Sequence, residues 1–141
     1  MGNAGYSSAV QAVVSWYGVF DMIAQERELK KIGGPDPSLP DYRKMWLGAS
    51  VSDIPGLIHF TNPLHFITPN FPPVLIHHGS ADKTVPFLQA YLLEEKVRTL
   101  CGAGRAELEI MEGYKHGGID LRWNEPDNIN KSFAFLDKHM K

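Results

Sequence analysis

The chain has 141 residues, of which 43% are apolar, and its formal net charge is −2. This length and apolar content suit one ordinary domain with a real core, so we expect residues 1–141 to form a single folding unit. The near-neutral charge offers no basic surface for nucleic acid and no charged run for a membrane surface. We therefore expect no nucleic-acid or membrane partner, and a small molecule as the ligand.

The compartment is left open by the sequence. Cys101 is the single cysteine, so it cannot form an internal disulfide, and its place in an apolar helical pattern predicts a buried structural thiol. The N-terminus lacks the basic-then-apolar layout of a secretory signal, and no apolar run has the length of a membrane span. These features favour the cytoplasm over export.

The first part of the chain predicts a strand and then a helix. A β-branched and aromatic run over 10–17 is typical of a strand that is buried on both faces. After a loop at 20–22, the charged segment 23–32 has a helical composition and ends at Gly33.

A proline-rich segment follows, with seven prolines between residues 33 and 72. Proline at this density excludes long regular elements. Short helices fit at 41–47, behind Pro40, and at 52–60, behind the cap signals of Ser52 and Asp53. We expect residues 33–72 to form an irregular helical excursion over the site.

The second part of the chain is organised around the stretch 71–86. It predicts a buried strand that two prolines precede and that Gly79 ends, in a turn that presents Asp82 at the carboxyl end of the strand. The segments that follow alternate in type: an amphipathic helix at 87–100, a strand with one wet face at 106–111, a glycine turn around His116, and a helix at 127–140 whose apolar stripe is Ile129, Phe133, Leu136 and Met140.

This alternation predicts the α/β fold class, with a mostly parallel sheet of about three strands flanked by helices. Ligands of such sheets bind beyond the carboxyl ends of the strands, and both Asp82 and His116 follow such an end. A carboxylate beside an imidazole fixes its tautomer and stabilises the imidazolium that forms when the histidine accepts a proton. The pair is thus a candidate orienter and general base.

The segment HGSADKTVP at 78–86, followed by GYKHG at 113–117, resembles the acid and histidine segments of α/β-hydrolases. The similarity is to acetyl-xylan, feruloyl and carboxyl esterases and to prolyl-oligopeptidase-like hydrolases. Residues 10–21 resemble the strand that follows the nucleophile helix in those enzymes, and Asn62-Pro63 resembles the polar-proline step before the acid strand. The resemblance covers nearly the whole chain but only the C-terminal half of the family's fold.

The resemblance implies that Asp82 and His116 are the catalytic acid and histidine of a serine hydrolase acting on a carboxylic ester. In that family the elbow Gly-x-Ser-x-Gly lies upstream of the first segment seen here. The nearest match is Gly5-Tyr6-Ser7-Ser8-Ala9, which lacks a strand before it and a helix after it. We therefore expect a C-terminal fragment that is inactive alone. The alternative is a complete small esterase that uses Ser7 or Ser8.

Other residues carry further expectations. Tyr17 and Trp46 are candidates for substrate contact, because loops near the crevice are expected there. His77 and His78 are neighbours on a strand and point to opposite faces, so they cannot easily share a metal ion. A zinc or iron site on His78, Asp82 and His116 lacks a further ligand, so no metal and no cofactor is expected.

A second alternative belongs to another class of function. Removing the first strands of the fold would expose an apolar edge at 10–17, and exposed edges pair with other chains. The chain would then be a non-catalytic module that binds through its sheet edge. The same edge predicts a homo-oligomer or a partner chain that carries the N-terminal half.

Overall fold

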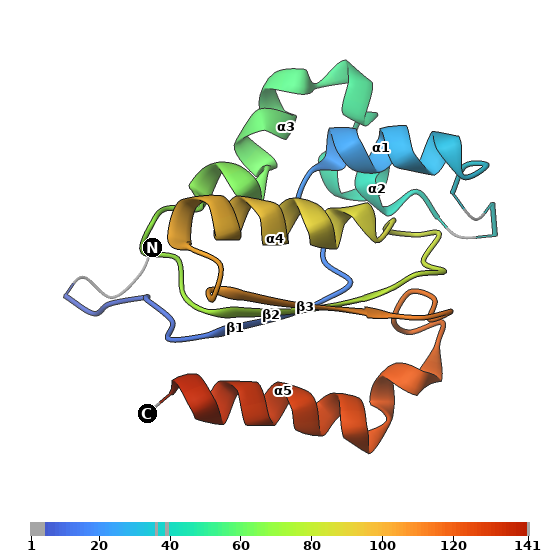
Figure 1. The fold of residues 1–141 in the computed structure, drawn as a ribbon. Coiled ribbons are helices and arrows are strands. Elements are labelled where there is room, and N and C mark those ends of the chain that lie inside the picture. The colour runs from blue at the N-terminus through green and yellow to red at the C-terminus, as the bar shows by residue number, and fades with distance from the viewer. Residues whose placement is uncertain (1–4, 36, 39, 141) are drawn as a thin grey trace.

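A parallel sheet of three strands, in the order β1-β2-β3, runs through the middle of the molecule (Figure 1). The computed structural model describes residues 5–35, 37–38 and 40–140. The strands are β1 (Val13–Trp16), β2 (Val74–Gly79) and β3 (Ala106–Met111). Because all pairs are parallel, the carboxyl ends of the strands lie at the same edge of the sheet.

The middle strand, β2, is buried along its whole length because it has a neighbour on each side and helices over both faces. Val74 and Ile76 point into the main core, where they meet residues of the helix that follows β2. Their β-branched side chains pack well on a pleated surface. This rigid strand is the support from which the Asp82 turn leaves.

The first strand is shorter and more exposed than the pattern over 10–17 predicts. Only Val13–Trp16 is extended and paired, and Val10 is 60% exposed. The prediction that this strand is buried on both faces was wrong, because β1 is an edge strand that pairs with β2 alone among the described residues. Its other backbone edge carries no described strand.

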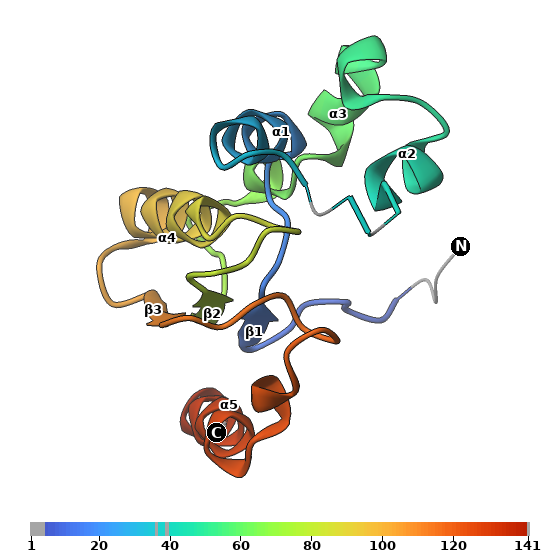
Figure 2. The ribbon, with the colours of Figure 1, turned by 90° about the vertical axis from the view of Figure 1, so that its right-hand side faces the viewer.

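Helices cover the two faces of the sheet unequally, as Figure 2 shows. Of the α-helices in the described residues, four lie on one side and α5 lies on the other. In chain order they are α1 (Met22–Lys31), α2 (Tyr42–Leu47), α3 (Pro55–Thr61), α4 (Leu88–Cys101) and α5 (Pro126–His139). Short 3₁₀ turns occur at Val51–Asp53, Pro63–Phe66 and Leu121–Asn124.

Polar caps set where the early helices begin. Asp21 accepts a hydrogen bond from the amide of Ala24, so α1 starts one residue earlier than predicted. Asp41 caps α2 in the same way, so this helix begins at Tyr42, one residue later than predicted. The helix predicted at 52–60 is instead divided, because Pro55 occupies the first helical position of α3.

Three of the four residues in the apolar stripe predicted on α5 are exposed, and the fourth, Leu136, is half-buried. Ile129, Phe133 and Met140 are exposed, and the helix buries Phe135 and Asn128 instead. The Asn128 side chain donates to the carbonyl of Arg122, in the 3₁₀ turn that precedes the helix. An apolar strip of α5 is therefore left on the surface.

Cys101 ends α4 and is only half-buried, with its thiol hydrogen-bonded to the carbonyl of Thr68. The prediction of a buried thiol was therefore too strong. Among the described residues, none of the helices has the length and apolar character needed to cross a membrane.

Candidate active site

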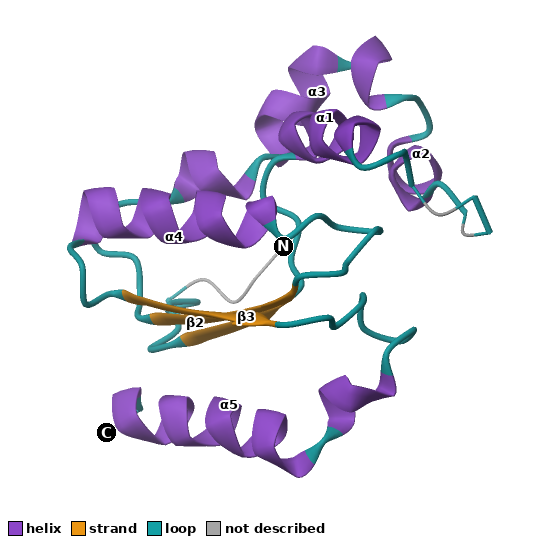
Figure 3. Ribbon diagram, turned by 45° about the vertical axis from the view of Figure 1, so that its right-hand side comes forward, coloured by secondary structure: helices purple, strands orange, loops and turns teal. Residues whose placement is uncertain are grey.

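The loops that leave the three strands gather at one end of the sheet, as Figure 3 shows. Tyr17 directly follows β1, Asp82 lies in the turn after β2, and His116 lies in the loop after β3. The parallel topology thus brings together residues that are far apart in the chain.

Asp82 and His116 are in direct contact. Asp82 Oδ2 lies 2.7 Å from His116 Nδ1, and the Asp82 side chain is buried while that of His116 is 22% exposed. A carboxylate only accepts hydrogen bonds, so Nδ1–H is the donor and Nε2 is left free to accept a proton. The predicted acid–histidine pair has the geometry of an orienter and a general base.

Three further groups surround the Asp82 carboxylate. Its Oδ1 accepts hydrogen bonds from the amides of Thr84 and Val85, both at 2.8 Å. His78 Nε2 lies 3.4 Å from Oδ2 but makes its shorter contact, 2.8 Å, with the carbonyl of Val85. Burial acts to raise the pKa of Asp82, but hydrogen bonds from His116, His78 and Val85 outweigh it and hold the pKa below its usual value. The carboxylate is therefore ionised at neutral pH.

The loop that carries His116 is fixed by a cluster that the sequence did not reveal. Asp120 Oδ2 accepts from the amide of Lys115 at 2.9 Å, and buried Trp123 donates from Nε1 to the Lys115 carbonyl at 2.8 Å. Arg122 donates to the carbonyl of Gly113 and pairs with Asp120, which holds the pKa of that carboxyl well below its usual range. The loop is thus held on both sides of the histidine.

Tyr17 packs against His116 and has an uncommon backbone conformation. Its φ of 46° is in the left-handed region, where residues other than glycine are uncommon, and its amide donates to the His77 carbonyl at 2.8 Å. The ring meets the His116 ring edge to face, with centroids 4.7 Å apart, and meets Trp123 in the same way at 5.0 Å. Strained residues of this kind cluster at functional sites.

A close backbone approach explains why Gly79 ends β2. A Cβ at that position would collide with the backbone carbonyl of Tyr114, which accepts a hydrogen bond from the Ala81 amide at 3.0 Å. The absence of a side chain lets the acid turn and the histidine loop cross closely.

A cavity of about 750 Å³ opens beside His116. Tyr17, Tyr42 and Trp46 contribute aromatic side chains to it, and Arg43 contributes the cationic one. The structure thus brings both predicted substrate-contact residues, Tyr17 and Trp46, to the cavity that His116 lines. Whether they touch a substrate stays a prediction.

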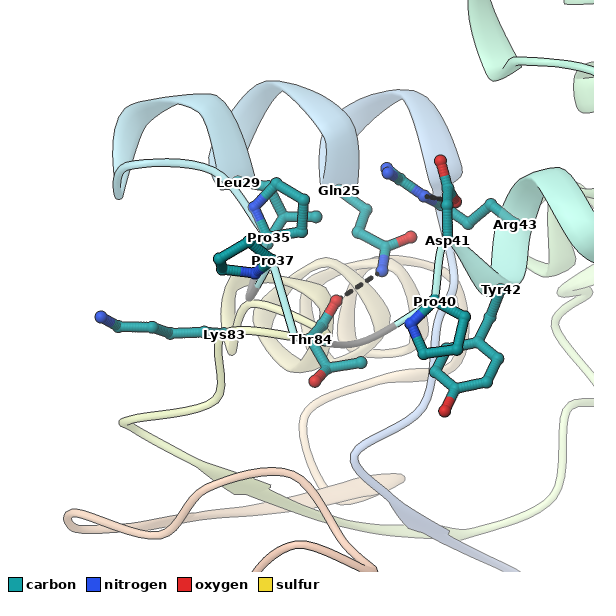
Figure 4. A pocket seen from close by; sticks show the side chains of 10 residues that line it. All are labelled: Gln25, Leu29, Pro35, Pro37, Pro40, Asp41, Tyr42, Arg43, Lys83 and Thr84. Atoms are coloured by element: carbon teal, nitrogen blue, oxygen red, sulfur yellow. Dashed lines mark hydrogen bonds and ion pairs between the residues drawn. The ribbon is translucent and has the colours of Figure 1, made fainter.

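Two buried glutamines form hydrogen bonds with the backbone of loops near the site, and neither was predicted. Gln89 of α4 accepts from the amides of Phe20 at 2.8 Å and Asp21 at 2.7 Å, and donates to the Asp21 carbonyl. Gln25 of α1 donates from Nε2 to the carbonyl of Thr84 at 2.9 Å, in the acid turn (Figure 4). In the sequence, the only indication of such a role is a polar side chain within the apolar pattern of each helix.

The candidate nucleophiles at the N-terminus lie apart from this arrangement. Ser7 and Ser8 are exposed, in a segment that is neither helix nor strand, and neither lines the cavity beside His116. Ser7 Oγ accepts from the amide of Ala9 at 3.1 Å. Among the described residues, no group of three or more His, Cys, Asp or Glu side chains could hold a metal ion.

Curated relatives include a peptidase and an esterase. The chain is 32% identical over 90 residues to the uncharacterized peptidase YtmA of Bacillus subtilis, covering 62% of this chain and 31% of that protein. It is 27% identical over 114 residues to the esterase LipQ of Mycobacterium tuberculosis, covering 81% of this chain and 25% of the relative. The chain therefore spans less than a third of the length of either relative.

Solved structures with a similar arrangement include esterases. A truncated form of a carbohydrate esterase from gut microbiota has a TM-score of 0.76 at 25% identity, covering 99% of this chain and 46% of that one. The bifunctional GH43-CE of Bacteroides eggerthii has a TM-score of 0.72 at 26% identity, over 99% of this chain and 19% of its own. Native esterase 2 of Thermogutta terrifontis has a TM-score of 0.58 at 26% identity, over 97% and 44%.

These neighbours agree with the parallel sheet, and the predicted partial α/β-hydrolase fold is confirmed. A model of the BD-FAE family matches residues 2–97, which is more than half of the chain. The chain belongs to the BD-FAE family of α/β-hydrolase-like proteins.

Proposed function

We propose that this chain supplies the acid and the general base of a serine-type carboxylic ester hydrolase. The observation that carries the proposal is the contact of 2.7 Å between Asp82 Oδ2 and His116 Nδ1, at the wall of a cavity of about 750 Å³. Esterases among the relatives and the structural neighbours support an ester as the bond that is cleaved.

In the proposed reaction, His116 Nε2 takes the proton of a serine hydroxyl while the serine oxygen attacks the ester carbonyl. The imidazolium returns this proton to the alcohol oxygen as the carbon–oxygen bond of the ester breaks. Water then attacks the acyl-enzyme with the same assistance, releasing the acid and restoring the serine. Asp82 remains ionised throughout and stabilises the imidazolium.

The nucleophile is proposed to come from residues outside 1–141. The exposed position of Ser7 and Ser8 supports this, since neither shares the cavity with His116. The second backbone edge of β1 and the exposed apolar strip of α5, formed by Ile129, Phe133 and Met140, offer surfaces on which such residues could pack. The same surfaces support a homo-oligomer or a partner chain that carries the N-terminal half of the fold.

The substrate is proposed to be an ester of a carbohydrate. Two of the structural neighbours are named as carbohydrate esterases or as a bifunctional protein with a CE part. Exposed Trp46 and Tyr42 beside the cavity suit a ring-shaped ligand, because aromatic faces pack on apolar ring faces.

The test is reconstitution. The chain is co-expressed with an N-terminal fragment of a related carbohydrate esterase that carries Gly-x-Ser-x-Gly, and hydrolysis of p-nitrophenyl acetate is measured. We expect activity only in the mixture, with a loss of about a thousandfold or more in the His116→Ala mixture and no loss with His59→Ala, whose side chain is exposed on α3.

Two results would contradict the proposal. One is stoichiometric labelling of Ser7 or Ser8 by a fluorophosphonate probe in the chain alone, which would identify a complete small esterase. The other is a reconstituted activity that His116→Ala leaves unchanged, which would remove the histidine from the reaction.

A further inference from the structure

Five buried side-chain polar atoms have no hydrogen-bond partner among the described residues, and three of them belong to His77 and His78. The other two, the acceptor Gln25 Oε1 and the donor Arg43 Nη1, belong to residues that line the cavity beside His116. Buried polar groups are nearly always satisfied, so an unpaired group in a native structure calls for an explanation such as a bound water or ligand. Here an acceptor and a donor occur on residues that line the same cavities.

The orientation of Gln25 is fixed by its other contact. Its side-chain amide nitrogen donates to the Thr84 carbonyl at 2.9 Å, and the residue is only 3% exposed. The carboxamide oxygen must therefore point away from Thr84. Figure 4 shows it directed to the side where Asp41, Tyr42 and Arg43 lie. The acceptor is thus presented to the α1–α2 side of the cavity.

Within the described part of the chain, Arg43 makes one ion pair. Its Nε lies 3.3 Å from Asp41 Oδ1, and its side chain is 18% exposed. The Asp41 carboxylate offsets much of the guanidinium charge at this distance. What Arg43 offers to a ligand is therefore mainly a hydrogen-bond donor.

The two atoms belong to residues that connect a small cavity with the large one. Gln25 and Arg43 line both the cavity of about 130 Å³ shown in Figure 4 and the cavity of about 750 Å³ that His116 lines. Trp46 and Tyr42 also line the large cavity and are 74% and 45% exposed. Aromatic faces therefore lie beside a donor and an acceptor.

We propose that Gln25 Oε1 and Arg43 Nη1 form a polar subsite that binds neighbouring hydroxyl groups of a sugar ring, with Trp46 packing on the face of that ring. The inference rests on the proposed function, and it assigns the residues that recognise the alcohol part of the ester. A hydroxyl group both donates and accepts, so a pair of them satisfies both buried atoms.

The charges at the subsite favour a neutral group over a carboxylate. A carboxylate would satisfy Arg43 but would place oxygens against the Gln25 acceptor and near the Asp41 carboxylate. Acceptors facing acceptors in a partly dry site are destabilising. A neutral diol avoids this repulsion.

Binding to the chain itself tests the subsite without any hydrolysis. The ¹⁵N-labelled chain is titrated with methyl β-D-xylopyranoside and, as a matched probe without hydroxyls, with 2-methoxytetrahydropyran. We expect the xyloside to shift the Gln25 side-chain amide, the Arg43 Nε–H and the Trp46 indole N–H in a saturable way. The probe without hydroxyls should shift the Trp46 signal alone.

Variants complete the test. Gln25→Met and Arg43→Met should each weaken xyloside binding by about tenfold, the effect of one lost hydrogen bond in a protected site, and Lys30→Met on the exposed face of α1 should leave it unchanged. Arg43→Met keeps the test decisive if Gln25→Met fails to fold. A folded chain in which the xyloside shifts neither Gln25 nor Arg43 overturns the proposal, and so does a nuclear Overhauser contact showing that the two side chains pair with each other.

These outcomes are separate from those of the reconstitution. If Gln25 and Arg43 do not bind the sugar, the reconstituted enzyme should still hydrolyse p-nitrophenyl acetate, because that ester has no sugar. If Asp82 and His116 do not act in catalysis, the chain should still bind the xyloside.

Discussion

The phenol ring of Tyr17 occupies the space in which a side chain at position 117 would begin. A Cβ built on Gly117 would collide with the far end of the Tyr17 ring, and no left-handed φ is involved at this glycine. The requirement for glycine is therefore steric, and it keeps the Tyr17 ring against His116, whose ring centroid is 4.7 Å away.

Gly117→Ala is expected to destabilise the chain by about 1–3 kcal/mol, the usual cost of overpacking a tight site. Chemical denaturation measures this free energy of unfolding. Gly104→Ala is the matched control, since nothing lies within 4 Å of its Cβ and its backbone conformation suits alanine. In a Tyr17→Gly background the cost of Gly117→Ala should vanish. An equal cost in both backgrounds would show that Tyr17 is not what the new methyl group meets.

Gln89→Leu removes the side chain that joins α4 to the start of α1. The amides of Phe20 and Asp21 would lose their acceptor, and each partly buried donor left unpaired costs about 1–3 kcal/mol, here at the low end because the site is only half-buried. Urea unfolding should therefore show a clear loss of stability. Glu95→Leu, on the exposed face of the same helix, should change it little. Equal stabilities of the two variants would show that the hydrogen bonds of Gln89 to Phe20 and Asp21 do not stabilise the fold.

The sequence was sufficient to predict the strands and the acid–histidine pair because both depend on local signals. The prolines, the apolar run and Gly79 mark β2, and the parallel topology then brings Asp82 and His116 to the same edge. Burial was harder to predict. β1 is half-exposed because, among the described residues, it has a neighbouring strand on one side only. The residues of β1 alone do not reveal how many neighbours the strand has.

The groups that support the site were not predictable for a related reason. Gln25 and Gln89 bond to backbone atoms 59 and up to 69 positions away in the chain, so no periodic pattern marks them. On α5, apolar spacing pointed to a stripe through Phe133, but Asn128 and Phe135 are buried instead. The polar contact of Asn128 with the carbonyl of Arg122 joins two distinct segments, so the apolar pattern of the helix does not reveal it.

Asp82→Asn should allow the ring of His116 to adopt either neutral tautomer. The ionised carboxylate accepts from His116 Nδ1 at 2.7 Å, and a charge-assisted hydrogen bond of this length moves the donor proton far downfield in an NMR spectrum. We expect this signal in the unchanged chain and its loss in Asp82→Asn, with ¹⁵N shifts showing a mixture of ring tautomers. Asp137→Asn, on the exposed side of α5, should keep the signal. Its persistence in Asp82→Asn would mean that another group orients the ring.

The lowered pKa of Asp82 predicts how stability changes in acid. Its folded-state pKa lies below the usual 3.8 because the hydrogen bonds of His116, His78 and Val85 outweigh burial. As the pH falls, the unfolded chain binds the proton first, so the stabilisation is complete above the unfolded pKa and is lost as the pH drops through the folded one. We therefore expect the difference in unfolding free energy between the unchanged chain and Asp82→Asn to shrink from pH 5 to pH 2, a window of about three units around the usual carboxyl pKa.

Guanidinium unfolding at each pH measures this difference. Asp120→Asn is a second test of the same linkage, because the Asp120 carboxyl also has a lowered pKa, held by Arg122 and by the amide of Lys115. The stability difference between the unchanged chain and Asp120→Asn should therefore also shrink as the pH falls. A difference for Asp82 that stays constant over this range would show that its carboxylate gains nothing from its neighbours in the folded state, and the hydrogen bonds around it would then not stabilise its ionised form.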